Sequence, residues 1–256
     1  MRLAILTQTI GRATGPDLQR TNLLAAGIPQ DQMIALVGLD GPDVPREVVP
    51  RYWTHNAHVF VGDQKLGCAA GLNELLRIAA HGARPDFFCV VDDDIALPDG
   101  WAAALIAHHA IVAGDGWVPG VSSFLIEGQK GVETVCTCRQ YWPRRHVIGG
   151  VRFFSALTQQ ALGYFCEDYG LYGFDDCDFG DRAHRTGRLN YYVTVARSRH
   201  LGATASQGGI TKTKVVQAAR EAYRHNVALY SKGERLFQDY IPKDVGLIKL
   251  QNEGGN

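Results

Sequence analysis

The chain has 256 residues, of which 46% are hydrophobic and 20% are charged, and its formal net charge is zero. This composition is typical of a soluble globular protein, and it gives no global signal for nucleic acid or for a membrane surface. No apolar run approaches the roughly 18 residues that span a bilayer, and the first apolar stretch ends at Leu6. We therefore expect a cytoplasmic protein without a transmembrane segment.

The first half of the sequence alternates predicted strands and helices. In chain order we expect a strand over Arg2–Thr9, a helix over Asp17–Ala26, a strand over Met33–Gly38, a loop over 39–56, a strand over Ala57–Gly62, a helix over Gly67–Ala80, a strand over Phe87–Val91, a helix from Asp99 to Ala113 and a strand over Val118–Leu125. This alternation predicts an α/β fold with a Rossmann-like, mostly parallel sheet flanked by helices on both faces.

The second half is less regular. Strands are predicted over Val132–Cys138, His146–Phe154 and Asn190–Val195, and helices over Thr158–Phe165, Cys177–Thr186 and Lys214–Tyr230. The tail after Gly246 is polar and is expected to be loose. With no repeat and no clear linker in the sequence, we expect residues 1–130 and 131–256 to be two halves of one continuous domain.

Charge is distributed unevenly between these halves. Residues 1–130 carry nine Lys and Arg against fourteen Asp and Glu, a balance of −5, and residues 131–256 carry seventeen against twelve, a balance of +5. An acidic half suits a cation site, and a basic half suits an anionic ligand. Chance scatter over a solvated surface explains the asymmetry equally well.

Three consecutive aspartates are the most informative feature. Asp92, Asp93 and Asp94 directly follow the apolar strand Phe87–Val91, and parallel sheets bind ligands at the carboxyl ends of their strands. Adjacent carboxylates repel one another unless a cation neutralises them, and Mg²⁺ or Mn²⁺ often combines one or two carboxylates with substrate phosphates. On an extended backbone Asp92 and Asp94 face the same way, which leaves Asp93 to hold the backbone or an arginine. The alternative is a solvated acidic turn before a helix capped by Asp99.

A second charged segment covers residues 173–187. Acids come first and bases follow, which complements the dipole of a helix. Spacings of four residues predict ion pairs between Asp178 and Arg182 and between Asp181 and Arg185.

Asp175 and Asp176 have no necessary part in that pattern. At the start of a helix their carboxylates can face a cleft, where one of them can act as a general base towards an acceptor hydroxyl. His200 follows the predicted strand Asn190–Val195, and neutral imidazole is a common metal ligand, although a lone histidine is more often structural or exposed.

The cysteines suggest a reducing compartment. They lie at positions 68, 89, 136, 138, 166 and 177, without a CxxC pair. Cys89 lies in an apolar run and is expected in the core. Cys136 and Cys138 share one face of a strand, where packing is favoured over metal binding or a redox pair.

Together these motifs, over about residues 1–202, resemble the GT-A fold and specifically the family 2 type of inverting glycosyltransferases. The resemblance rests on Thr7 and Thr9 in the first strand, on Leu66-Gly67 through Asn73 and Gly82, on VDDDIALPDGW, on Gly149-Gly150 with Phe153-Phe154-Ser155, on FDDCDFGDRAHRTG and on His200. Asp175 stands where that family usually has Glu, so the choice between Asp175 and Asp176 as base stays open.

The resemblance implies a nucleotide-sugar-binding half over 1–130 and an acceptor-binding half over 131–256 with a C-terminal helix. Donor contacts are expected from Thr7, Thr9, Asp40, Lys65, Asp92 and Asp93. Ligands for Mn²⁺ or Mg²⁺ are expected from Asp94, Asp92 and His200. Contacts to the acceptor or to phosphate are expected from Gly150, Trp142, Arg182, Lys212 and Lys214, of which the two lysines match no pattern of that family.

Two of these expectations have equally simple structural explanations. Lys212 and Lys214 lie beside Gly208 and Gly209, so they belong either to a lid that closes on phosphate or to a solvated basic loop. Trp142 is more readily explained as a buried loop anchor than as a ligand contact.

The implied activity is metal-dependent transfer of a hexosyl or pentosyl group, with inversion, from a nucleotide diphosphate donor to a hydroxyl. A UDP-sugar is the favoured donor, and the acceptor is a glycan, a lipid-linked glycan or modified DNA. For a hydroxylated base in DNA, Tyr141, Trp142, Arg144 and Arg145 would stack on the target and neutralise it. A sugar nucleotidyltransferase is the alternative enzyme, with Gly11–Pro16 as a faint Gly-rich loop.

Overall fold

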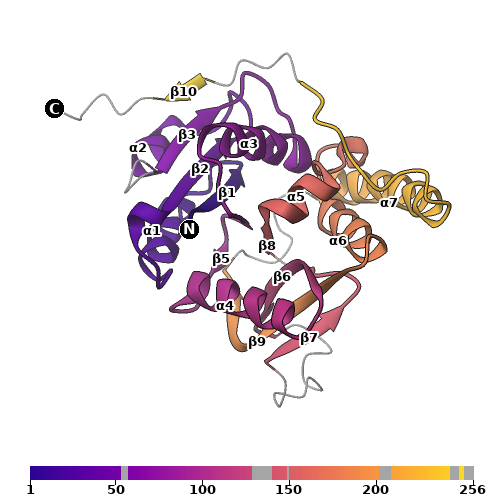
Figure 1. Cartoon of the computed structure of the whole chain (residues 1–256). Helices are drawn as coiled ribbons and strands as arrows, with labels where there is room; N and C mark the ends of the chain where they lie inside the picture. Colours follow the sequence, from indigo (N-terminus) through magenta and orange to yellow (C-terminus); the bar gives the residue numbers. More distant parts are fainter. Residues whose placement is uncertain (53–56, 129–139, 149, 202–208, 243–247, 251–256) are drawn as a thin grey trace.

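The structure is a computed structural model, and it has a mixed α/β architecture (Figure 1). It describes residues 1–52, 57–128, 140–148, 150–201, 209–242 and 248–250. Within this part of the chain, no helix combines the length and the apolar character needed to cross a membrane.

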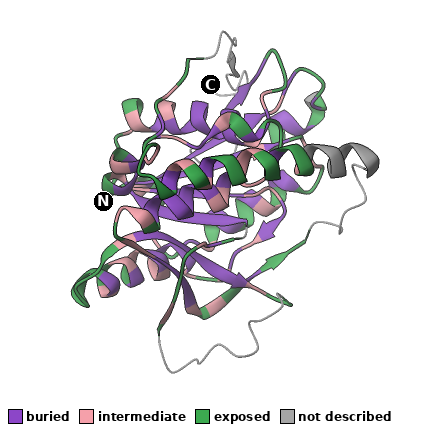
Figure 2. Cartoon of the chain, turned by 90° about the vertical axis from the view of Figure 1, so that its right-hand side faces the viewer, coloured by how far each residue is buried: buried purple, intermediate pink, exposed green. Residues whose placement is uncertain are grey.

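The first half forms the parallel part of the sheet. Strand β1 (Leu3–Thr9) lies between β2 (Met33–Leu39) and β4 (Phe87–Val91) and is parallel to both, and β3 (Ala57–Val61) extends the sheet beyond β2. These strands are nearly continuous apolar runs because both faces of the sheet are covered (Figure 2).

Successive side chains of β1 point to opposite faces of the sheet. Ala4 and Leu6 contribute to a core cluster with α3 (Cys68–Gly82). Leu3 and Ile5 contribute to a second cluster, with residues of α1 (Gly15–Leu24) and α4 (Trp101–Gly114). The strand period of two therefore builds a separate apolar layer on each face.

The second half continues the same sheet. Its longer strands are β6 (Val118–Ile126), β7 (Tyr141–Arg144), β8 (Val151–Ser155) and β9 (Arg188–His200), and the short strands are β5 (Ile95–Ala96) and β10 (Ile248–Leu250). The order is β10-β3-β2-β1-β4-β8-β6-β9-β5, with β7 paired to β9. Of these ten described strands, six run in one direction, namely β1, β2, β3, β4, β6 and β9.

The remaining helices lie mainly in the second half. They are α5 (Ala156–Leu162), α6 (Asp175–Arg185) and α7 (Gly209–Ser231), with the short segments η1 (Gln30–Gln32), η2 (Arg46–Val48), α2 (Val49–Tyr52) and η3 (Glu167–Tyr169). Figure 1 shows α5, α6 and α7 gathered on one side of the molecule, away from α1 and α2.

Two antiparallel pairings position the functional site. Strand β8 lies beside β4, and this register places Arg152 opposite Val90. The two-residue strand β5, directly after the three aspartates, pairs with the end of β9 and places His200 opposite Ile95. Residues from the second half are thus brought to the carboxyl end of β4.

The predicted α/β fold is confirmed, and the differences are local. The loop expected over 39–56 contains η2 and α2, and the strand expected over His146–Phe154 begins only at Val151. The tail expected to be loose includes β10, which pairs with β3 at the sheet edge. The whole strand expected over Val132–Cys138, with both of its cysteines, lies outside the described residues.

Candidate functional site

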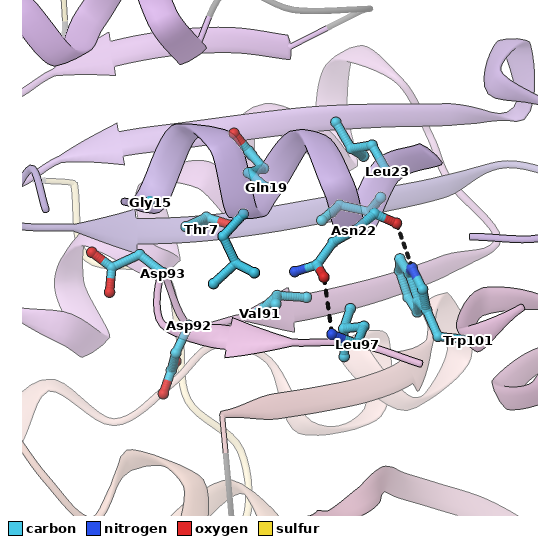
Figure 3. Close-up of a pocket in the computed structure, with 12 residues that line it drawn as sticks. Thr7, Gly15, Gln19, Asn22, Leu23, Val91, Asp92, Asp93, Leu97 and Trp101 are labelled. Carbon is cyan, nitrogen blue, oxygen red and sulfur yellow. Dashed lines mark hydrogen bonds between the residues drawn. The ribbon is translucent and has the colours of Figure 1, made fainter. Parts of the chain in front are cut away.

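The three aspartates lie where β4 ends and the chain turns. Asp92 pairs with Arg152 at 3.1 Å, Asp93 pairs with Arg12 at 3.2 Å, and Asp94 contacts Arg12 as well. Figure 3 shows the side chains of Asp92 and Asp93 diverging from this turn. The expected alternation of Asp92 and Asp94 against Asp93 is not found, because the backbone is a turn and Asp93 and Asp94 share Arg12.

A pocket opens beside this turn, between β1, β4 and α1. Its lining includes Thr7, Gly15, Asp92, Asp93 and Trp101 (Figure 3). Thr7 therefore lines the same pocket as two of the aspartates.

Asn22 of α1 fixes the chain that follows the aspartates. Its side chain donates to the Ile95 carbonyl at 2.8 Å. The same side chain accepts from the Leu97 amide at 2.9 Å, and the Asn22 carbonyl accepts from the Trp101 indole at 2.7 Å (Figure 3). All of these groups are buried, so their hydrogen bonds hold the exit from the turn in one position.

The end of β1 contributes a second set of contacts. The Thr9 hydroxyl donates to Asp93 and accepts from the Gly11 amide at 2.9 Å, and the Thr9 carbonyl accepts from the Asp40 amide at 2.9 Å. The Asp40 carboxylate in turn accepts from the Leu66 and Gly67 amides at 2.8 and 3.1 Å, in the loop before α3. This loop also carries Lys65, which is exposed. Thr9, Asp40 and Lys65 thus lie at the end of β1 and on the loops that follow β2 and precede α3.

Arg152 joins the aspartate turn to the start of α6. Its side chain is only 5% exposed, and it contacts Asp92 with one terminal nitrogen and Asp175 with the other. The Sγ atom of Cys68, at the start of α3, lies 3.8 Å from the same Asp175 carboxylate. A single buried guanidinium thus holds carboxylates from both halves of the chain.

The crowding of carboxylates around Arg152 changes their proton affinities. Although 46% of the Asp92 side chain reaches solvent, desolvation by the surrounding protein raises its pKa to about 6; Arg152 opposes this shift, and Asp175 adds to it. The pKa of Asp176 is also raised, chiefly by burial and then by the charge of Asp175, with Arg152 opposing. Both shifts mark a site in which negative charge is costly, as a functional site often is.

Gly150 allows the turn to approach β8 closely. Its carbonyl accepts from the Asp92 amide at 2.8 Å. A Cβ atom at this position would lie only 2.1 Å from Cγ1 of Ile95 and 3.2 Å from Cβ of Asp92. The structure therefore gives Gly150 a supporting contact with the aspartate turn, whereas the sequence suggested a contact to acceptor or phosphate.

The ion pairs of α6 are partly as expected. Asp178 and Arg182 form the predicted pair at 2.8 Å, and both side chains are fully buried. The predicted pair of Asp181 with Arg185 is wrong, because Asp181 binds Arg145 at 2.5 Å and His146 at 2.9 Å.

The expectation that Arg182 contacts an acceptor or a phosphate is also wrong. Its guanidinium donates to the Leu162 carbonyl at 2.6 Å and to the Tyr164 carbonyl at 2.8 Å, in addition to Asp178. With no exposed surface, Arg182 anchors α6 to the segment after α5.

Trp142 does not join the site, and the side chains of the two lysines are outside the described part of the chain. Trp142 lies on β7, where it packs against Tyr192 and beneath Arg144, whose guanidinium carbon is 3.3 Å from the ring centroid. Positions 212 and 214 are residues of α7. The backbone at these two positions is therefore helical, where the sequence suggested a lid or a solvated basic loop.

The three aspartates were predictable from the sequence, but the arginines that hold them were not. Arg12 follows β1 by three residues, and Arg152 is a single charge within the buried strand VRFFS. A charged side chain inside a buried strand needs a partner of opposite charge. That requirement was the available signal for Arg152.

Asp94 and His200 are suited to hold a divalent cation. The Oδ2 atom of Asp94 lies 3.5 Å from Nε2 of His200, close to the ~3 Å that separates adjacent ligands around an octahedral ion with bonds of ~2.1 Å. Among the described residues, no group of three or more His, Cys, Asp or Glu side chains is arranged to hold a metal ion. The pair fits a cation that takes its other ligands from phosphates and water.

Comparisons with known proteins agree with this geometry at the level of fold. No protein-family model and no curated protein sequence matches the chain. Among solved structures, a mannosyltransferase from Pyrobaculum calidifontis in complex with GDP-Man and Mn²⁺ is similar with a TM-score of 0.66 and 17% identity, over 87% of this chain and 64% of that chain. GalNAc-T7 with UDP, GalNAc and Mn²⁺ is similar with a TM-score of 0.62 and 14% identity, over 86% of this chain and 48% of that one.

A third similar structure is residues 1–349 of TarS from S. aureus. It has a TM-score of 0.56 and 16% identity, over 78% of this chain and 60% of that chain. The chain thus spans less than two thirds of the length of each of these three proteins. At such low identities the likeness establishes the fold alone. The protein has the GT-A type of fold that these glycosyltransferases share.

Proposed function

We propose that the protein is a metal-dependent glycosyltransferase that moves a sugar, with inversion, from a nucleotide diphosphate donor to an acceptor hydroxyl. One observation carries this proposal: residues from distant parts of the sequence lie close together at the carboxyl end of β4. They are Asp92, Asp94, His200, Asp175 and Asp176. Such an edge is where α/β sheets bind their ligands.

The donor lies, in this proposal, against the half formed by residues 1–130. Thr7, Thr9, Asp40 and Lys65 contact the nucleotide, with Asp92 and Asp93 at the ribose. Support comes from the pocket beside β1 and β4 and from the adjoining loops that carry Asp40 and Lys65. A UDP-sugar is the first donor to test, since two of the similar proteins have been solved with UDP.

Asp94 and His200 would hold the divalent cation, Mn²⁺ or Mg²⁺, with Asp92 close by. When bound, the cation supplies positive charge that neutralises the departing diphosphate. The distance between the two ligand atoms and their oxygen and nitrogen chemistry support this assignment.

Asp176 is the base in this proposal, and Asp175 positions it. Asp175 is buried and bound to Arg152, so its oxygens are held by a strong charge-assisted contact. Asp176 is less buried, and its raised pKa makes it a better proton acceptor. It removes the acceptor proton as the hydroxyl attacks the anomeric carbon, and departure of the diphosphate from the opposite face inverts that carbon.

The acceptor lies against residues 131–256, and a glycan, a lipid-linked glycan and modified DNA are its candidate classes. Of the residues considered for DNA, Arg145 binds Asp181, Arg144 covers Trp142, and Tyr141 donates to Asp115 at 2.6 Å. These contacts within the chain favour testing glycan acceptors first.

A binding screen followed by a transfer assay tests the proposal. Thermal unfolding is measured with UDP, GDP and other nucleoside diphosphates, with and without Mn²⁺ or Mg²⁺. We expect one diphosphate to stabilise the protein only together with the cation, and Asp94→Asn to remove that effect. The matching nucleotide sugars then report transfer or slow hydrolysis. Absence of cation-dependent stabilisation by every diphosphate contradicts the proposal, and release of pyrophosphate from a nucleoside triphosphate would identify a nucleotidyltransferase instead.

A further inference from the structure

Arg12 contacts Asp94, one of the proposed cation ligands, and the neighbouring Asp93. It lies in the loop between β1 and α1, directly after Gly11, whose φ of +82° and hydrogen bond to Thr9 set the course of this loop. From there the guanidinium reaches Asp93 at 3.2 Å and also contacts Asp94. The Arg12 side chain is 38% exposed, whereas the two carboxylates are 8% and 9% exposed. Arg12 therefore covers these acids on the side that faces solvent.

Arg12 and a bound cation would compete for the same carboxylate oxygen of Asp94. The Oδ2 atom of Asp94 contacts Nη1 of Arg12 and lies 3.5 Å from Nε2 of His200. A divalent cation held by Asp94 and His200 needs a lone pair of this oxygen. It would also meet the positive charge of Arg12 at a distance of only a few ångströms, where like charges repel strongly.

We propose that Arg12 is an exchangeable counter-ion. In the donor-free protein it neutralises Asp93 and Asp94, and when a cation and a nucleoside diphosphate arrive together it leaves Asp94 for the phosphate oxygens. This inference rests on the proposed function and adds to it an order of events and a role for a residue outside the predicted site. A planar guanidinium is suited to both partners, because it binds carboxylate and phosphate through the same pair of donors.

The charges at the site favour joint binding. Asp93, Asp94 and Arg12 together carry one negative charge. A divalent cation alone changes this to one positive charge, and the diphosphate of a nucleotide sugar alone changes it to three negative charges. Both ligands together restore the single negative charge, so each ligand raises the affinity for the other.

A purely structural role for Arg12 predicts the opposite outcome. If Arg12 served only to hold Asp93 and Asp94 in place, its removal would disorder the carboxylates and weaken cation binding. If it exchanges, its removal frees Asp94 and takes away a repelling charge, so the nucleotide-free protein binds the cation more tightly. The sign of the change therefore separates the two roles.

The test measures Mn²⁺ affinity from the electron paramagnetic resonance signal of free Mn²⁺, with and without saturating UDP or GDP. For the wild type we expect the nucleotide to raise Mn²⁺ affinity at least tenfold. For Arg12→Gln we expect nucleotide-free affinity to rise by on the order of tenfold and the effect of the nucleotide to shrink by a similar factor. Arg12→Lys keeps the charge and should stay within about threefold of the wild type. Arg20→Gln removes an exposed arginine of α1 and should change neither affinity.

Two results overturn the inference, and they differ in what else they affect. Unchanged or weaker nucleotide-free Mn²⁺ binding by a folded Arg12→Gln, verified by circular dichroism, refutes the exchange of Arg12 and leaves the proposed function intact. Failure of the wild type to couple Mn²⁺ to any nucleoside diphosphate removes the proposed function and this inference together. The wild-type coupling needs no variant and tests the proposed function alone. If Arg12→Gln does not fold, Arg12→Ala, which also removes the charge, is measured in its place, with the same expected rise in nucleotide-free Mn²⁺ affinity.

Discussion

Two neighbouring aspartates at the start of α6 have different surroundings, and these surroundings assign different roles. Asp175 is bound to the buried Arg152 and lies 3.8 Å from Sγ of Cys68. Asp176 makes a local contact, accepting from the Cys177 amide at 2.7 Å, and keeps part of its surface exposed. One carboxylate is therefore part of the framework, and the other is available to react.

Replacing each aspartate by asparagine should separate these roles. We expect Asp176→Asn to lower kcat about 10²–10⁴-fold, with little change in stability or in UDP binding, because a general base is lost. We expect Asp175→Asn to lower the free energy of unfolding by about 3 kcal/mol, because it leaves a buried guanidinium short of one negative partner. Urea denaturation and transfer kinetics measure the two effects. The reverse pattern, with Asp176→Asn unstable and Asp175→Asn inactive but stable, would exchange the two assignments.

The same proton-accepting residue should set the acid limb of the pH profile. The pKa of Asp176 is raised above its ordinary value by burial and by Asp175, so the carboxyl becomes protonated at a higher pH than an exposed aspartate does. Since a base must be deprotonated to act, kcat should fall as pH decreases through this raised pKa. A kcat profile that stays flat down to pH ~4, near the ordinary pKa of aspartate, would contradict the role of Asp176.

At the scale of elements, α6 is held by the Asp178–Arg182 pair that its own sequence predicts and by further ion pairs that its sequence does not reveal. Asp181 is fully buried and binds Arg145 and His146, which precede β8, although the spacing along the helix suggested Arg185. Burial opposes the negative charge of Asp181, but the hydrogen bonds from His146 and Arg145 outweigh burial and lower its pKa. This contact ties α6 to the chain that leads into Gly150 and Arg152.

The lowered pKa predicts how stability depends on pH. A carboxyl with a lower pKa in the folded state stabilises the protein above its unfolded pKa of about 3.9, and this contribution is lost as pH falls through the folded value. Asp181→Asn should therefore cost about 1.5–3 kcal/mol at pH 7, and the difference from the wild type should shrink below pH ~4. Asp17→Asn, which breaks an exposed pair with Arg51, is the control and should cost less than about 1 kcal/mol. A pH-independent effect of Asp181→Asn would show that shape, not charge, matters at this position.

The elements were largely predictable from the sequence, and their side-chain partners largely were not. The strand Phe87–Val91 was predicted to its observed bounds because five consecutive apolar residues are a local signal. The partners of the aspartates lie 60 and 82 residues away in sequence, at Arg152 and Arg12, and no periodicity encodes such distances. Strand β5 was missed for a related reason, since two residues become a strand only through their pairing with β9.

At the scale of the whole molecule, the two halves of the chain share one sheet, and their junction lies within the site. Strand β8, from the second half, is the direct neighbour of β4, from the first. The pairing of β4 with β8 therefore sets the positions of the aspartate turn and of Arg152, which in turn binds Asp175 at the start of α6. Any change that separates β8 from the turn after β4 should affect stability and ligand binding together.

Gly150 is the position at which this dependence can be tested. An added Cβ would lie 2.1 Å from Cγ1 and 2.6 Å from Cδ1 of Ile95, a fully buried side chain that has little room to move. We expect Gly150→Ala to cost about 1–3 kcal/mol by overpacking and to weaken the stabilisation by UDP with Mn²⁺, since the displaced turn carries Asp92 and leads into β5, which pairs with His200. Gly82→Ala at the end of α3, where an added Cβ meets nothing within 4 Å, is the matched control and should be neutral or stabilising by up to about 1 kcal/mol. If Gly150→Ala loses stability but binds UDP with Mn²⁺ as the wild type does, the strand junction supports the fold without setting the geometry of the site.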